Sequence, residues 1–144
     1  MTINLIRMAV QIESVAHLQQ VQSKRLLAAT NKGQSRLFTF TRNIPRRTVE
    51  LVNGGSIYWV IKRYIRIRQR ILAIEKQTNR EGRSHCAIEI DPEPIQVVPR
   101  RQKAFQGWRY LQMEDSPQDL IATDVDATDI PDELEKELRE LGLL

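Results

Sequence analysis

The sequence predicts an α+β fold: a curved, mainly antiparallel sheet or small pseudo-barrel packed against an N-terminal helix, with an acidic C-terminal helix. β-Branched and aromatic residues are dense from residue 56 to residue 90, as is typical of strands. One segment with helical spacing of apolar residues precedes them, at residues 15–30. The length of 144 residues suits one domain, which buries roughly 68–70% of the surface of its unfolded chain.

The first half of the chain begins with a strand and a helix. Residues 2–11 carry apolar side chains at both parities, which predicts a strand buried on both faces. Ser14 offers an N-cap oxygen for a helix that runs to about residue 30. Residues 36–42 alternate as a short strand does, and residues 46–52 predict a short helix. The buried stripe of the first helix is expected to contain Val15, Leu18, Val21, Arg25 and Leu26.

The second half is predicted to be mostly β. Strands are expected at residues 56–63, 65–77, 84–90, 95–98 and 105–111. A turn at residues 79–82 makes a hairpin of the second and third of these, so neighbours pair antiparallel. A helix over residues 64–77 is an alternative, because its arginines and glutamines tolerate helices. Residues 99–103 predict a basic loop.

Charge divides the chain in two. Residues 1–110 hold 20 Lys and Arg against 7 Asp and Glu, a net charge of +13, whereas residues 111–144 hold 2 against 11, a net charge of −9. We therefore expect a compact domain at residues 1–111 and, at residues 112–144, an acidic linker with a short amphipathic helix. The apolar stripe of that helix is Leu134, Leu138 and Leu141. It is expected to dock on its own domain or on a partner chain, because so short a helix is marginal alone.

No residues form a recognisable catalytic or metal-binding motif. The single cysteine, Cys86, excludes an intramolecular disulfide and fits a cytoplasmic protein. His85 and Cys86 are neighbours on a predicted strand, so their side chains leave opposite faces and do not form a dyad. No apolar stretch approaches the roughly 20 residues of a membrane-spanning helix. We predict no cofactor, no metal and no membrane partner, and a binding protein rather than an enzyme.

The basic residues of residues 65–77 form the candidate binding surface. In a strand, Arg66, Arg68 and Arg70 point to one face at intervals of roughly 6.6 Å, which is close to the phosphate spacing of nucleic acids. Sixteen of the 22 basic residues are arginines, whose planar guanidinium suits phosphate recognition. The alternative is an ordinary solvated sheet face whose arginines pair with carboxylates such as Glu89.

Other residues extend this candidate surface. Aromatic side chains can stack on unpaired bases, and Trp108 and Tyr110 are predicted to do so, with Tyr58 as a further platform. The complete set of candidate nucleic-acid-binding residues is Arg46, Arg47, Lys62, Arg66, Arg68, Arg70, Arg100, Arg101, Lys103, Trp108, Arg109 and Tyr110.

Three sequence blocks resemble a family of small uncharacterised bacterial proteins, a domain of unknown function. They are GGSIYWVIK at residues 54–62, RQRIL at residues 68–72 and FQGWRY at residues 105–110. Arg63 stands where the resemblance leads us to expect a glycine in a tight turn. The resemblance implies one compact cytoplasmic domain and no catalytic residue. The order of helix, glycine turn and antiparallel strands is also similar to the pseudo-barrels of the PUA and ASCH type, which bind RNA or nucleotides.

These observations predict binding of RNA or another nucleic acid through an arginine-rich sheet face and aromatic stacking. Two alternatives remain. One is a protein-interaction module that uses the C-terminal helix and a sheet edge. The other is a small hydrolase with an unrecognised site. A second reading of the charge is that the basic body and the acidic tail neutralise each other.

Overall fold

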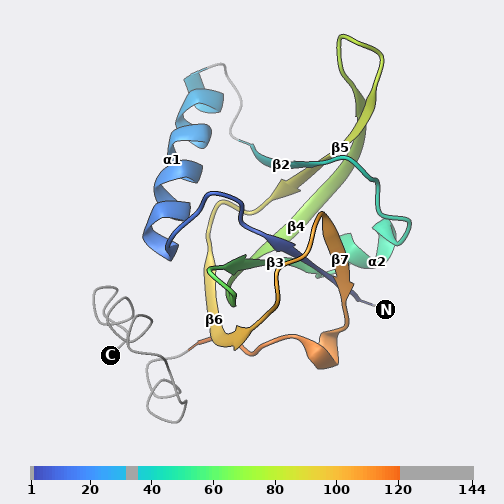
Figure 1. The fold of residues 1–144 in the computed structure, drawn as a ribbon. Coiled ribbons are helices and arrows are strands. Elements are labelled where there is room, and N and C mark those ends of the chain that lie inside the picture. Colours follow the sequence, from blue (N-terminus) through green and yellow to red (C-terminus); the bar gives the residue numbers. More distant parts are fainter. Residues whose placement is uncertain (1, 32–35, 121–144) are drawn as a thin grey trace.

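The fold is a seven-stranded mixed sheet with one long helix on it (Figure 1). The computed structural model describes residues 2–31 and 36–120. Along the chain, the described elements are β1 (Asn4–Met8), α1 (Val15–Asn31), β2 (Leu37–Thr41), α2 (Thr48–Val52), β3 (Ser56–Ile61), β4 (Tyr64–Thr78), β5 (Ser84–Ile90), β6 (Ile95–Arg101), β7 (Trp108–Leu111) and the 3-10 turn η1 (Met113–Asp115). Neither α-helix of these residues is both long and apolar enough to cross a membrane.

The strands are arranged in the order β2-β5-β4-β3-β1-β7, and β6 also pairs with β4. β1 and β3 are parallel, and the other described pairs are antiparallel. β5 and β6 follow one another along β4, because Ile90 is opposite Ile71 and Ile95 is opposite Arg68. The sheet is therefore mainly antiparallel but mixed, with the N-terminal strand in its interior as predicted.

The sheet is strongly curved without closing. Three strands separate β2 from β1 in the strand order, which in a flat sheet would be about 19 Å at 4.8 Å per strand. Nevertheless, Nη1 of Arg7 in β1 donates a hydrogen bond of 2.8 Å to Oγ1 of Thr39 in β2. No described ladder joins the two end strands, β2 and β7.

The long apolar and basic segment is a strand, so the alternative of a helix over residues 64–77 is wrong. β4 pairs with β3, β5 and β6. The β3–β4 turn consists of Lys62 and Arg63, both left-handed, with φ of 47° and 72°. This is the conformation that favours glycine, so Arg63 adopts the tight turn expected there although it is not a glycine.

Helix α1 begins as predicted and packs on the sheet. The backbone N–H of His17 donates to Oγ of Ser14 at 3.0 Å, which confirms Ser14 as the N-cap. Val15 and Leu18 are buried, but the third buried residue is Gln22, whereas Val21 is half-buried and Arg25 is exposed. The predicted stripe was therefore one residue out of register at its centre.

A buried amide pair explains that shift. Nε2 of Gln22 donates to Oε1 of Gln69 at 2.8 Å, and Nε2 of Gln69 donates to Oε1 of Gln22 at 2.7 Å. The Gln69 oxygen also accepts from Nε1 of Trp59 at 2.9 Å. Burying a polar group lowers stability unless it forms hydrogen bonds. The orientation of α1 therefore places Gln22, rather than Val21, against the sheet, where its amide bonds to Gln69.

Apolar side chains form two clusters, one on each face of the sheet. Ile57, Trp59 and Ile67 belong to the cluster under α1, while Tyr58 and Ile65 belong to the cluster on the opposite face. Ile65 and Ile67 lie two residues apart and would share a face in a regular strand. They do not, because a register shift leaves the residue between them out of the pairing with β3.

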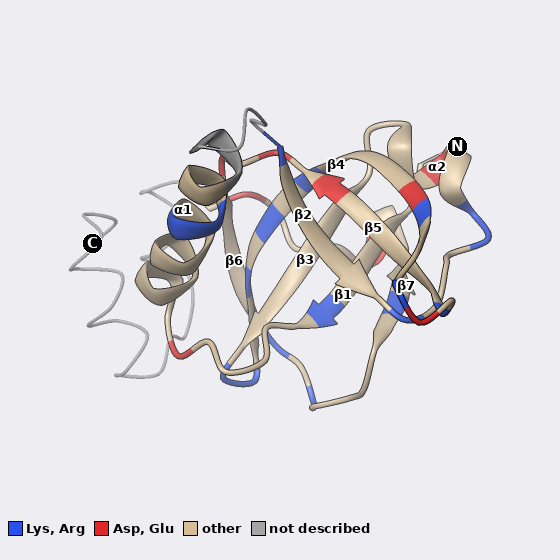
Figure 2. Ribbon diagram, turned by 90° about the horizontal axis from the view of Figure 1, so that it is seen from above, with Lys and Arg blue, Asp and Glu red and all other residues tan. Residues whose placement is uncertain are grey.

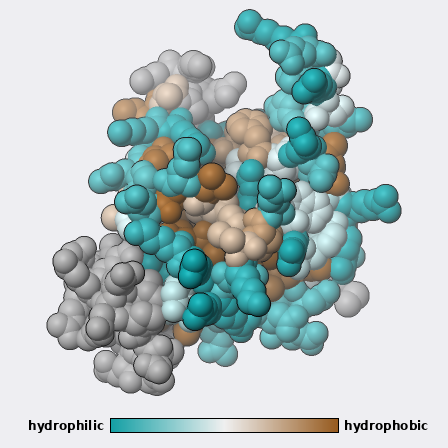
Figure 3. Space-filling view, viewed as in Figure 1, coloured by the Kyte–Doolittle hydropathy of each residue, from teal (hydrophilic) through white to brown (hydrophobic). Residues whose placement is uncertain are grey.

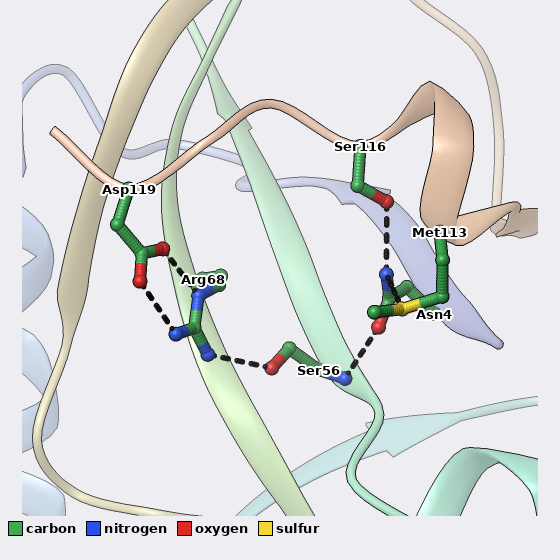
Figure 4. A network of polar contacts seen from close by, with 6 residues as sticks. All are labelled: Asn4, Ser56, Arg68, Met113, Ser116 and Asp119. Carbon is green, nitrogen blue, oxygen red and sulfur yellow. Dashed lines mark hydrogen bonds and ion pairs between the residues drawn. The ribbon is translucent and has the colours of Figure 1, made fainter. Parts of the chain in front are cut away.

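Residues 112–120 form a strap across the second face of the sheet (Figure 4). Its backbone bonds to β6, since the N–H of Val98 donates to the Gln118 carbonyl and the N–H of Leu120 donates to the Gln96 carbonyl, each at 2.8 Å. Gln118 and Asp119 are consequently extended. The predicted acidic helix, with Leu134, Leu138 and Leu141, lies outside the described residues.

Side chains hold the strap through one continuous network. Nδ2 of Asn4 donates to Oγ of Ser116 at 2.8 Å, and Oδ1 of Asn4 accepts from the N–H of Ser56 at 2.8 Å. Arg68 donates to Oγ of Ser56 at 3.0 Å and to both carboxylate oxygens of Asp119, at 2.6 and 2.8 Å. The network joins β1, β3, β4 and the strap (Figure 4).

The first prediction concerns Gly55. A Cβ there would clash with the carbonyl oxygens of Ile3 and Leu51, so we expect Gly55→Ala to lower the free energy of unfolding by about 3 kcal/mol. Gly54→Ala is the matched control, because it has a φ of +84° but open space around it, and should cost about 1 kcal/mol. Urea denaturation measures both; equal losses would show that the close approach at Gly55 is not what constrains this site.

The second prediction concerns Asp119. Its hydrogen bonds to Arg68 lower the pKa of its carboxyl from 3.8, so the stabilisation is complete above that value and is lost as the pH falls through the lower folded-state pKa. Asp119→Asn should therefore reduce stability modestly at about pH 7, since the pair is partly exposed, and reduce it less near about pH 2.

Urea denaturation at the two pH values measures this difference. Glu81→Gln, in the exposed β4–β5 turn, is the control and should change stability at neither pH. A loss of stability in Asp119→Asn that is the same at both pH values would contradict an ionic contribution from the pair.

Candidate nucleic-acid interface

The predicted arginine ladder of β4 is not a continuous exposed surface. Arg66 is 2% exposed, Arg68 is engaged by Asp119 and Ser56, and Arg70 is exposed. The β-bulge at Arg66 breaks the alternation on which the ladder depended. The bonds of Arg68 to Asp119 also raise its own pKa. Among these three arginines, only Arg70 presents its side chain openly to solvent.

The aromatic residues of β7 are occupied by contacts within the domain. The rings of Trp108 and Tyr110 meet edge to face, with centroids 5.0 Å apart. Nε1 of Trp108 donates to the Asn43 carbonyl at 3.1 Å. The Tyr110 hydroxyl accepts from the backbone N–H groups of Arg46 and Arg47, at 2.9 and 3.1 Å. Both rings are half-buried, and they fix the segment before α2 to β7.

Arg47 is held by the same structure. It forms an ion pair with Glu50, and its guanidinium carbon lies 5.5 Å from the centre of the Tyr110 ring. Hydrogen bonding between the two partners raises the pKa of Arg47 and lowers the pKa of Glu50. Arg46 is exposed. Tyr58, the further stacking candidate, is 5% exposed and is therefore a core residue.

Three of the predicted residues, Lys62, Arg101 and Lys103, do come together with Arg63, at the end of the sheet where β3 turns into β4. We call Lys62, Arg63, Arg101 and Lys103 the basic turn cluster. Arg101 is opposite Tyr64 in the β4–β6 ladder, and the N–H of Gln102 donates to the Arg63 carbonyl at 2.7 Å. All four side chains are exposed, and none forms an ion pair within the described residues. Blue segments mark this turn and the loop after β6 in Figure 2.

Two further arginines, Arg100 and Arg109, lie close in the sequence to Arg101 and Lys103 of the cluster. Arg100 is exposed and donates to the Asp115 carbonyl of the strap. Arg109 is exposed, and its guanidinium carbon lies 4.6 Å from the centre of the Phe105 ring. Residues 99–101 are part of β6, so the predicted basic loop at residues 99–103 begins later than expected.

Arg63 was not among the predicted binding residues. The sequence resemblance identifies Arg63 only as a substitution for a turn glycine, although its positive charge is evident. Pairing between β4 and β6 brings Arg63 and Arg101 together, although they are far apart in the chain. The sequence signal that points to Arg63 is a two-residue turn made of two basic residues, Lys62 and Arg63.

Cys86 and His85 do not form a catalytic dyad. Cys86 is fully buried, and burial raises the pKa of its thiol. The ring of His85 is 5.7 Å from the ring of Phe40 and 3.3 Å from Oε1 of Gln77. Alternation along β5 separates the two side chains, as expected from their adjacent positions.

Comparisons with known proteins give the chain a family and no activity. No curated protein and no solved structure matches the sequence significantly. One family model matches residues 5–144, nearly the whole chain, and its description is "Protein of unknown function (DUF1489)". The chain therefore belongs to the DUF1489 family of proteins of unknown function.

Proposed function

We propose that the protein binds single-stranded nucleic acid, in the first place RNA, through the basic turn cluster. The observation that carries the proposal is that four exposed cations from two distant segments meet without an ion pair to a described carboxylate. Elsewhere on the described surface, Arg36, Arg47 and Arg68 do pair with carboxylates. Lys24, Lys76, Arg80 and Arg83 also form no ion pair within the described residues, so the convergence of four cations at one turn is what favours the cluster as the place where an external anion binds.

The geometry of the turn also suits a phosphate backbone. A two-residue turn and the end of an adjacent strand project long cationic side chains from a rigid base, so little of the backbone must be ordered on binding. Contacts to phosphates are sequence-independent and strengthen as salt is lowered, because counterions are released from the nucleic acid. The expected ligand is therefore recognised mainly by charge.

Base stacking is the second part of the proposal. Trp108 and Tyr110 form hydrogen bonds within the domain. The planar guanidinium groups of exposed arginines are therefore better placed than these aromatic rings to stack on bases. Arg109 above Phe105 forms such a plane, and guanidinium planes stack on unpaired bases. Arg46 and Arg70 are peripheral contacts in this proposal.

A protein-interaction role is the second candidate, and the edge of β2 favours it. β2 ends the strand order, so one side of its backbone has no strand partner in the described sheet. Phe40 on this strand is 53% exposed. An extended peptide could add to such an edge by β-augmentation; Phe40→Lys would then abolish partner binding without affecting RNA binding.

The third prediction tests the basic turn cluster. Replacing Lys62, Arg63, Arg101 and Lys103 together by Gln should weaken binding of an oligouridylate of about 20 nucleotides at least about tenfold. The slope of log affinity against log salt should fall by about 0.7 for each phosphate contact that is lost. Fluorescence anisotropy at several salt concentrations measures both quantities.

The matched control removes the same charge from another part of the surface. Lys24, Lys76, Arg80 and Arg83 are exposed residues on α1 and around the β4–β5 turn, and their replacement by Gln should change affinity little. Equal losses in the two variants would mean that net charge alone drives binding. Unchanged affinity in the cluster variant would refute the interface.

The fourth prediction concerns the acidic end of the chain. Residues 121–144 contain 8 Asp and Glu against 2 Lys and Arg, and we propose that they compete with nucleic acid for the basic surface. Deleting them should raise RNA affinity and speed association at low salt, and the gain should shrink at high salt because screening weakens both interactions. Stopped-flow fluorescence measures the rates. A gain that does not depend on salt would contradict electrostatic competition.

A further inference from the structure

A cleft of about 460 Å³ opens between α1, the end of β1 and β2, on the side of the sheet away from the strap. Arg7 and Arg25 line it from the strand and the helix, and Thr39 and Trp59 line it from β2 and β3. In the view of Figure 3, brown and tan apolar surface reaches solvent in the middle of this face, surrounded by hydrophilic side chains. Its volume is in the range of pockets that bind small molecules.

Two arginines give the described lining of the cleft a net positive charge. Among the described residues that line it, none is an aspartate or glutamate. Nη1 of Arg7 donates to Oγ1 of Thr39, and its guanidinium carbon lies 6.0 Å from the centre of the Trp59 ring. Burial, followed by repulsion from Arg25, lowers the pKa of Arg7. An anion placed between the two guanidinium groups would offset both effects.

The rest of the lining is mainly apolar. Leu18 and Val21 of α1 contribute aliphatic surface, and Trp59 contributes an indole whose N–H is already bonded to Gln69. The amides of Gln22 and Gln69 bond to each other, so they offer few free groups to a ligand. A base or a sugar, which needs several polar partners, fits this lining poorly, whereas an aliphatic or aryl body fits it well.

We propose that this cleft binds a small amphiphilic anion: a carboxylate or phosphate head between Arg7 and Arg25, with an apolar body against Leu18, Val21 and Trp59. The site is separate from the basic turn cluster, and its ligand is a discrete small molecule rather than a polyanion. Each guanidinium offers a planar pair of donors that matches the oxygens of either head group.

The first experiment uses Trp59 as the reporter. The chain has two tryptophans, so Trp108→Phe in the full-length protein leaves only the tryptophan of the cleft. Titration with octanoate and with octyl phosphate should shift its emission and saturate, and the tighter of the two identifies the head group. Octanol, which lacks the charge, and inorganic phosphate, which lacks the apolar body, should each bind at least about tenfold more weakly.

Substitutions then assign the site. Arg25→Gln should weaken binding of the better probe at least about tenfold, while Lys24→Gln, its exposed neighbour outside the cleft lining, should leave it unchanged. Val21→Glu, which brings a carboxylate to the lining, should abolish binding. Calorimetry on the wild-type chain gives the same comparison if Trp108→Phe proves unstable.

Three outcomes would overturn the proposal. Equal binding of octanol and octanoate would show that charge is not recognised. Equal losses in Arg25→Gln and Lys24→Gln would show that the cleft is not the site. If oligouridylate, but neither amphiphile, shifts the Trp59 emission, the cleft belongs to the nucleic-acid interface instead. Failure of RNA binding alone would leave this proposal intact.

Discussion

Strand β4 must pair with three other strands, and most of the fold depends on that requirement. Its 15 residues would extend over about 50 Å if straight, whereas a compact domain of 144 residues is roughly 37 Å across. The strand therefore has to bend. Register shifts at Arg66 and near Leu72 supply the bends, and they assign the first part of β4 to β3 and β6 and the second part to β5.

The same bends separate the features of β4 that the sequence predicts from those that it does not. The position of the strand is predictable, and the face of each side chain is not. The positions of the β3, β4 and β5 strands follow from dense β-branched residues and a strong turn at residues 79–82, so they were predictable. The face of each β4 side chain was not, because alternation holds only in a regular strand and no local signal marks Arg66 as a bulge. The basic surface was consequently assigned to Arg66, Arg68 and Arg70, of which one is buried and one is paired.

The candidate interface shows a similar limit. Lys62, Arg101 and Lys103 were recognisable as basic residues, but their proximity depends on pairing between β4 and β6. The bond between Gln22 and Gln69 also joins positions that are distant in the chain, and polar residues carry no periodic signal of burial. In each case composition indicated the chemistry, while tertiary pairing determined the site.

The position of β1 has a consequence for how the chain folds. β1 lies between β3 and β7, and Asn4 is paired with Leu111, so the pairing of β1 cannot be completed until β7, the last strand of the described residues, is present. During synthesis the β3–β4–β5 meander can form from local contacts alone. The edge of β1 that pairs with β7 stays unpaired until β7 is made. Contacts of such high sequence separation slow folding, because a long loop must close before they form. The end of the sheet that β1 and β7 form therefore assembles after the β3–β4–β5 meander.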